Sequence, residues 1–279
     1  MPIFEMEIIS ACLLRDLPVY RRTFRSLEEF FPGSEIHLVT RKEDLQKFRD
    51  ACGSNLHLWD ESDFIPSMSL SQLRAAPLPF FPRGAGWYFQ QFLKYAFVDV
   101  SNEDDHFLIW DADTILLRPI DLFDEEGRPC YTEAEEYHQP YFETFRALFG
   151  EPAERTHSFI SQHQLVNKSI LRQMLLEIEA NHPSSRGWAW AIIDNMKGQG
   201  SNLFSEYETY GHYLKLRYPG TFSTRTRQWT RKGGESIGLP PWRPWLQLLA
   251  RHHDFAAFEA TDSPFRRIIR GCRNLSRGS

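Results

Sequence analysis

Two carboxylates separated by one residue, Asp111 and Asp113, directly follow the apolar run 106–110. A short run of this kind predicts a buried strand. Carboxylates at the carboxyl end of a parallel strand lie at the edge of the sheet, where they can share a hard divalent cation. Such a cation takes oxygen ligands, and the phosphates of a nucleotide diphosphate would complete its shell. The alternative is a polar turn in which both side chains are solvated.

The chain before this pair predicts the sheet that would position it. Residues 7–14, 36–40 and 56–59 have the length and composition of buried strands. Residues 19–31 and 45–52, between these strands, repeat apolar side chains at helical spacing. Strands that alternate with helices indicate a parallel sheet built by right-handed crossovers.

Later elements are expected on the same grounds. Residues 62–86 are rich in proline and serine and predict a long loop, which is unusual unless it is functional. Residues 86–97 predict the helix that precedes the strand of Asp111. The remaining expected elements are strands at 129–132, 157–166 and 221–230, helices at 168–180, 188–196 and after 205, and a loop or short helix at 133–141.

Three segments resemble known glycosyltransferase sequences. Residues 107–114 read Phe-Leu-Ile-Trp-Asp-Ala-Asp-Thr, and with the following Leu-Leu-Arg-Pro they resemble the metal-binding signature of GT-A fold glycosyltransferases. Residues 87–94, Trp-Tyr-Phe-Gln-Gln-Phe-Leu-Lys, and 205–211, Ser-Glu-Tyr-Glu-Thr-Tyr-Gly, resemble a family found in bacterial surface-polysaccharide loci. The resemblance implies an α/β fold of the Rossmann-like GT-A type, with a mixed, mostly parallel sheet flanked by helices. It also implies Mn²⁺ or Mg²⁺ bound against the diphosphate of a nucleotide sugar.

That fold would divide the chain into three parts. We expect a nucleotide-sugar-binding half at 1–130 and an acceptor-binding half of the same domain at 131–262. A basic amphipathic tail would follow at 263–279.

The segment that begins at Ser205 offers a candidate base. Ser205 fits a helix N-cap, and Glu208 fits the reciprocal position of a capping box. Glu206 then falls in the first turn, where the helix dipole stabilises a carboxylate. An inverting transfer needs a carboxylate to take the proton of the attacking hydroxyl. We predict Glu206 as this base, with Glu208 as the alternate.

The other candidate contacts follow from position in such a fold. Acceptor contacts are expected from His163 and Gln164. GT-A enzymes often add a late histidine to the metal shell, so His252 or His253 could join Asp113; a surface histidine pair is the alternative. Donor contacts are expected from strand ends and from the helix before the Asp pair: Ser10, Ala11, Arg15, Thr40, Arg41, Gln90, Lys94, Trp110, Asp111 and Ala112.

Composition limits the other classes. The 279 residues are 42% hydrophobic and 25% charged, which is ordinary for a globular protein. The four cysteines are widely spaced, so neither a disulfide framework nor a zinc site is expected. The acidic start and the absence of a long apolar window predict a cytoplasmic protein. We expect no nucleic-acid partner.

Charge is distributed unevenly. Residues 215–279 hold 13 Lys/Arg against 4 Asp/Glu, although the whole chain carries a net charge of −5. Residues 264–275 place apolar side chains at helical spacing among arginines, and 241–249 adds two tryptophans. A basic amphipathic helix of this kind can lie on an anionic membrane, here the inner face of the cytoplasmic membrane. The alternative is a helix that packs its apolar side on the domain.

We therefore expect a metal-dependent glycosyltransferase that moves a sugar from a nucleotide-diphosphate donor to a glycan or lipid-linked acceptor in bacterial surface polysaccharide synthesis. A haloacid-dehalogenase-like phosphohydrolase is the alternative enzyme, with Asp111 as nucleophile and Asp113 as acid. Its motif usually follows the first strand, whereas three predicted strands precede Asp111 here. A non-catalytic protein that binds sugar nucleotides is the third possibility. The sequence leaves open the donor, the linkage, the stereochemistry and the oligomeric state.

Overall fold

The computed structural model describes residues 5–76, 84–102, 105–184, 186–200 and 202–259. Its main sheet has five strands in the order β3-β2-β1-β4-β7. The first four strands are parallel, and β7 runs antiparallel to β4. The strands are β1 (Glu7–Ala11), β2 (Glu35–Thr40), β3 (Leu56–Asp60), β4 (His106–Trp110) and β7 (His163–Asn167). This confirms the predicted mixed, mostly parallel sheet.

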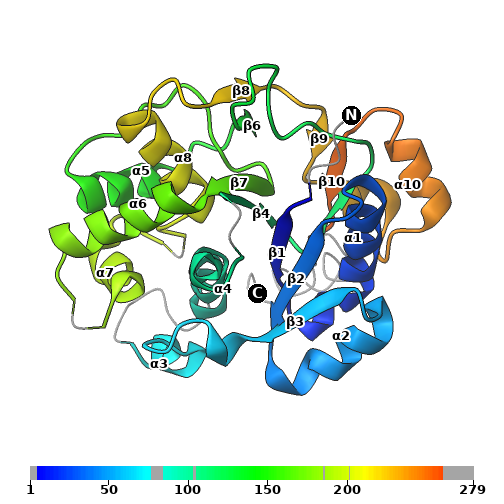
Figure 1. Cartoon of the computed structure of the whole chain (residues 1–279), viewed down its shortest axis with the longest axis horizontal. Helices are drawn as coiled ribbons and strands as arrows, with labels where there is room; N and C mark the ends of the chain where they lie inside the picture. The colour runs from blue at the N-terminus through cyan, green and yellow to red at the C-terminus, as the bar shows by residue number, and fades with distance from the viewer. Residues whose placement is uncertain (1–4, 77–83, 103–104, 185, 201, 260–279) are drawn as a thin grey trace, which may run out of the picture.

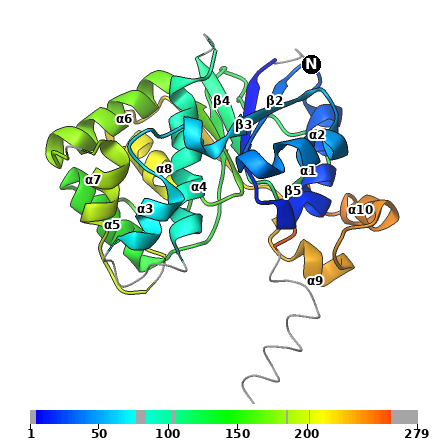
Figure 2. The same ribbon diagram turned by 90° about the horizontal axis from the view of Figure 1, so that it is seen from below.

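Helices cover both faces of this sheet (Figures 1 and 2). On one side lie α1 (Leu17–Phe30) and α2 (Leu45–Cys52). The other side is covered by a thicker group of helices. These are α3 (Leu70–Ala75), α4 (Ala85–Ala96), α5 (Gln139–Phe149), α6 (Lys168–Asn181), α7 (Trp188–Asn195) and α8 (Glu206–Arg217).

The helices form where apolar side chains recur at helical spacing. In α1 the buried Tyr20, Phe24 and Leu27 share one face, and Pro18 stands in the first turn, where its missing N–H leaves no hydrogen bond unmade. The buried side chains of α4 also pack on the sheet. One large apolar core therefore lies between the sheet and its helices.

Short strands bring the end of the described chain back to the Asp pair. β10 (Phe255–Ala257) pairs antiparallel with β5 (Thr114–Leu116), and β9 (Trp229–Thr230) pairs parallel with β10. β6 (Cys130–Thr132) and β8 (Ser223–Arg225) make a separate pair. The two remaining α-helices, α9 (Gly233–Ile237) and α10 (Arg243–Leu249), lie at the edge of the molecule on the side of α1 (Figure 2).

Two expectations need correction. The predicted loop at 62–86 contains α3, whose start has a complete capping box between Ser69 and Gln72. The segment from 133 leads into α5, a full helix of 11 residues. The amphipathic tail predicted at 263–279 lies outside the described residues. No helix in the described ranges has the length and apolar character needed to cross a membrane.

Candidate active site

The turn after β4 is held in place by buried hydrogen bonds. The N–H of Asp111 donates to the carbonyl of Gln162 at 2.9 Å, and the N–H of Thr114 donates to the carbonyl of Asp111 at 3.0 Å. Beneath the turn, Trp110 is fully buried and its indole N–H donates to the carbonyl of Thr114 at 2.7 Å. Ser10 Oγ donates to the carbonyl of Trp110 at 2.7 Å. These contacts fix both Asp side chains at the carboxyl edge of the sheet, close to where strand order reverses between β1 and β4.

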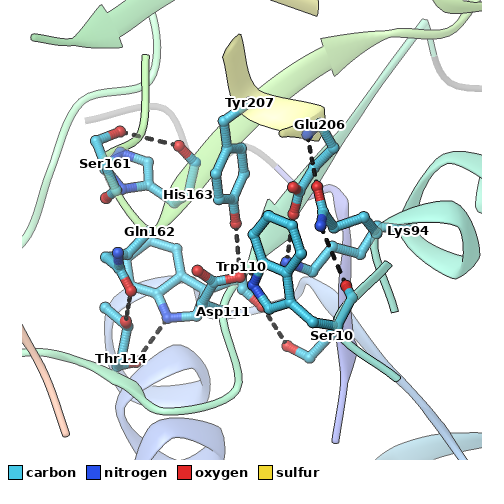
Figure 3. Close-up of polar contacts among 12 residues, drawn as sticks. Ser10, Lys94, Trp110, Asp111, Thr114, Ser161, Gln162, His163, Glu206 and Tyr207 are labelled. Atoms are coloured by element: carbon cyan, nitrogen blue, oxygen red, sulfur yellow. Dashed lines mark hydrogen bonds and ion pairs between the residues drawn. The ribbon is translucent and has the colours of Figure 1, made fainter. Parts of the chain in front are cut away.

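A buried lysine connects the two motifs that the sequence singled out. Lys94 on α4 is 2% exposed, and its ammonium donates to Asp111 and, at 2.7 Å, to Glu206 Oε1. Tyr207 OH donates to Asp111 Oδ1 at 2.8 Å. Gln91 accepts the N–H of Glu206 at 2.9 Å. Figure 3 shows Lys94 and Tyr207 converging on Asp111 from two helices, α4 and α8.

The charges in this cluster shift one another. Burial favours the neutral amine of Lys94, but the carboxylates of Asp111 and Glu206 outweigh it and raise the Lys94 pKa above its ordinary range. Burial raises the pKa of Glu206, although Lys94 acts in the opposite direction. Burial, followed by the charges of Asp111 and Glu259, raises the pKa of Asp113 to about 7. The charge of Lys94 acts in the opposite direction on Asp113 but does not offset these effects.

A cavity of about 570 Å³ opens over this cluster. That volume lies in the ordinary range of small-molecule sites. Its lining has six carboxylates, Asp16, Asp111, Asp113, Glu136, Glu206 and Glu259, and three cationic side chains, Arg15, Lys94 and Arg231.

Each of the three cations already contacts a carboxylate of the lining. Arg15 pairs with Asp16 at 3.2 Å, and Arg231 contacts Glu136 and Glu259. The cavity is therefore acidic, and its unshared carboxylate oxygens suit a hard divalent cation such as Mg²⁺ or Mn²⁺. Because the charges of Asp111 and Glu259 act on Asp113, these three carboxylates are the candidate ligands.

Most of the predicted donor residues lie at this cavity. Thr40 is buried at the end of β2 and Arg41 follows it, and neither lines the cavity. Ser10 and Trp110 lie beneath its floor. The predicted residues in the lining are Ala11, Arg15, Gln90, Lys94, Asp111 and Ala112.

The structure does not bring the predicted acceptor residues into the cavity. His163 is buried against Trp110, with ring centroids 5.0 Å apart. Gln164 is 1% exposed, and its amide donates to the carbonyl of Tyr207 at 2.9 Å. Their neighbour Gln162 does line the cavity, with a positive φ of 69°. Backbone strain of this kind is concentrated at functional sites.

Glu208 also lies away from the cavity. Its carboxylate accepts the N–H of Phe159 at 2.9 Å and lies 3.4 Å from His212 Nε2, within the core. Ser205 caps α8 as predicted, accepting the N–H of Glu208 at 3.4 Å. Of the two acids named from the sequence, Glu206 is the one that lines the cavity.

The late histidines are separated from Asp113 by the length of a strand. Ala257 pairs with Thr114, whereas Asp254 accepts the N–H groups of Leu117 and Arg118. Since His252 and His253 precede Asp254, they lie beyond the end of β5 opposite to Asp113. Glu259, on the near side of β10, lines the cavity instead.

Among the described residues, the group with the spacing of a preformed metal site lies at the opposite edge of the sheet. Ligand atoms of Glu7, Glu35 and His37 lie within 4.8 Å of one another. However, His37 Nδ1 accepts a hydrogen bond from Trp59 Nε1 at 3.0 Å. This leaves the proton on Nε2, which lies 3.6 Å from each carboxylate. A protonated ring nitrogen is no metal ligand, so the cluster is better described as a structural network.

Residues 14–236 match the family of unknown function DUF6492. The chain belongs to this family. No curated protein sequence matches it.

Solved structures show the fold. The apo form of mouse xyloside xylosyltransferase 1 matches with a TM-score of 0.50 and 16% identity, over 93% of this chain and 99% of that one. The apo structure of WbbM, a bifunctional glycosyltransferase, matches with a TM-score of 0.51 and 9% identity, over 95% of this chain but only 48% of WbbM. This DUF6492 chain therefore has the GT-A fold that the sequence predicted, and its activity has to be argued from the site itself.

Proposed function

We propose that this chain is a metal-dependent glycosyltransferase that uses a nucleotide-sugar donor. The observation that carries the proposal is the acidic cavity at the carboxyl edge of the sheet, where Asp111, Asp113 and Glu259 lie near the buried Lys94 and Glu206. A nucleotide diphosphate is strongly anionic and would be repelled by this cavity without a cation. Mn²⁺ or Mg²⁺ held by the three carboxylates would neutralise the diphosphate as it leaves.

Glu206 is the proposed base. The acceptor oxygen forms a bond to the anomeric carbon, the bond from that carbon to the diphosphate breaks, and the hydroxyl proton passes to Glu206. Burial keeps the pKa of this carboxyl raised, which makes it a better proton acceptor than an exposed glutamate. Lys94 holds its side chain by a 2.7 Å hydrogen bond. This role assumes an inverting reaction.

The acceptor is proposed to be a glycan or a lipid-linked sugar used in bacterial surface polysaccharide synthesis, at the inner face of the cytoplasmic membrane. Two aromatic rings in the lining, Trp87 and Tyr141, lie 6.5 Å apart and nearly parallel. Flat rings of this kind suit the apolar face of a sugar. We propose Trp87 and Tyr141 as acceptor contacts in place of His163 and Gln164. Most of the proposed donor contacts would then come from residues 1–130, with Glu259 added from 131–262, and the proposed acceptor contacts would come from both parts, Trp87 from the first and Tyr141 from the second.

Calorimetric titration tests the proposal. UDP, GDP and their common sugar conjugates are titrated with Mn²⁺ or with EDTA into the wild type and the Asp113→Ala variant. Asp124→Ala serves as a matched control, because Asp124 is bound by Arg128 outside the cavity. We expect micromolar binding that requires both metal and Asp113.

Two other outcomes would favour the alternatives. Hydrolysis of an aryl phosphate without any nucleotide binding would favour the phosphohydrolase. Metal-dependent binding without donor hydrolysis or transfer to any acceptor would favour a non-catalytic sugar-nucleotide-binding protein.

A further inference from the structure

The short helix α10 exposes apolar side chains that nothing in the described chain covers. Trp242 is 63% exposed, Trp245 48% and Leu248 43%. Its other side is different, since Leu246 and Leu249 pack on the small apolar cluster that includes Val19. The helix is therefore anchored by one side and presents two tryptophans and a leucine from the other.

Arginines lie near this apolar surface. Helix α1, which lies beside α10 in both views of the molecule (Figures 1 and 2), carries the exposed Arg21 and Arg25 and the half-buried Arg22. Burial and the charges of Arg25, Arg21 and Arg243 lower the pKa of Arg22, so Arg22 lies within electrostatic range of the other three arginines. Within the described ranges none of the four makes an ion pair with a carboxylate.

We propose that this surface, Arg21, Arg22, Arg25, Trp242, Arg243, Trp245 and Leu248, docks the protein on an anionic phospholipid bilayer. Clustered arginines repel one another and are stabilised by an anionic surface. Tryptophan is enriched at the membrane interface, where its ring enters the apolar region and its N–H stays hydrated. The surface combines both features on a helix that projects from the edge of the fold. It requires no spanning helix.

The surface is connected with the candidate active site. An apolar groove of about 240 Å³, lined by Val19, Leu239 and Phe258, runs beside α1. Arg15 and Asp16 line both this groove and the acidic cavity. Docking through α10 would bring this groove, which adjoins the cavity at Arg15 and Asp16, near the membrane, where a lipid-linked acceptor would be found. The docking surface itself does not depend on the proposed sugar transfer.

Vesicle co-sedimentation of the full chain tests the inference. The wild type should bind vesicles of phosphatidylcholine mixed with phosphatidylglycerol and should bind phosphatidylcholine alone much less. Arg22→Gln/Arg243→Gln should weaken binding at least about tenfold, because each arginine near an anionic surface contributes several-fold. Trp242→Ala/Trp245→Ala should weaken binding to a similar extent. Arg74→Gln/Arg146→Gln and Leu176→Ala are matched controls, since they remove exposed arginines and an exposed leucine from other helices.

Fluorescence gives a second measurement. Brominated phosphatidylcholine included in the anionic vesicles should quench the wild type, and Trp242→Phe/Trp245→Phe should lose most of this quenching while still binding. The proposal would be overturned if the wild-type protein did not bind anionic vesicles. Unchanged binding by both double variants would also overturn it and would assign the membrane contact to residues 260–279. Concentration-dependent dimerisation without vesicles, abolished by Trp242→Ala/Trp245→Ala, would overturn it as well. Nucleotide titration of the same variants separates this result from the proposed transfer, because none of these residues lines the cavity.

Discussion

Replacing Asp113 by asparagine should stabilise the ligand-free protein at neutral and alkaline pH while removing its metal-dependent nucleotide binding. Burial and the nearby charges of Asp111 and Glu259 raise the pKa of Asp113 from an ordinary value of 3.8 to about 7. A carboxyl whose pKa is raised on folding binds its proton more tightly in the folded state. Folding stability therefore falls as the pH rises from about 4 to about 7, and the full cost remains above that range.

The magnitude follows from the pKa difference. A difference of about 3 at about 1.36 kcal/mol each gives an upper limit of about 4 kcal/mol. Asp113 is only partly buried, so water screens its charge and we expect about 1–2 kcal/mol. Asparagine has nearly the same shape and no charge. For a chain of this size the melting temperature should rise by about 2–6 °C at pH 8, with little change at pH 4.

Calorimetric melting of wild type and Asp113→Asn between pH 4 and pH 8, in EDTA, measures this directly. Asp124→Asn is a control of opposite sign. Burial is the largest single effect on the pKa of Asp124 and raises it, but the hydrogen bonds and the charge of Arg128 together outweigh burial and lower the pKa. The variant should therefore melt at a lower temperature than wild type near neutral pH. If Asp113→Asn melts at or below the wild-type temperature at pH 8, the electrostatic account of the cavity is wrong.

Three further predictions concern the same cavity. Lys94→Met should destabilise the fold by about 3–5 kcal/mol in urea unfolding, because it leaves two carboxylates facing each other without a cation; adding Glu206→Gln should recover part of the loss, and additive losses would contradict this. Glu206→Gln alone should lower kcat by about 10²–10⁴-fold with little change in the donor KM, measured by nucleotide release. Gln162→Gly should change stability by no more than about 1 kcal/mol, because glycine tolerates a φ of 69° while the loss of a buried side chain that accepts a hydrogen bond from Thr114 acts in the opposite direction; the loss of the amide should raise a substrate KM, and a large loss of stability would show that Gln162 is structural.

Most of the main sheet was predictable because β1, β2 and β4 are short, mostly apolar and buried, and β3 alternates Leu-His-Leu before Trp59. A buried parallel strand needs no partner in the sequence to be recognised, so β1, β2, β3 and β4 could be identified one at a time. The two small sheets could not be predicted in this way. β9 and β10 have two and three residues; β10 pairs with β5, more than 100 residues earlier, and β9 pairs with β10. Pairing at that distance leaves no periodic signal.

The site shows the same division. Asp111 was predicted because it directly follows the apolar strand β4. Lys94 was predicted because it lies in α4, whose apolar side chains recur at helical spacing. Gln162 was missed although its neighbours His163 and Gln164 were named. The turn at Gln162 directs its side chain to the cavity, while the next two side chains enter the core, and strand alternation alone does not mark where a strand begins. Glu259 was missed because only the pairing of β10 with β5 brings it to the cavity, and the sequence gives no signal of that pairing.

The charge of the cavity has a consequence for the order of binding. Its six carboxylates outnumber its three cationic side chains, and those cations already contact carboxylates. A free nucleotide diphosphate would add negative charge to negative charge in a site partly shielded from water, where such repulsion is strong. A divalent cation neutralises charge on the carboxylates of the cavity and on the diphosphate at the same time. Binding should therefore proceed through the metal or the metal–nucleotide complex, and nucleotide titrated in EDTA should bind Asp113→Asn at least as well as it binds the wild type, because that variant lacks one of the repelling charges.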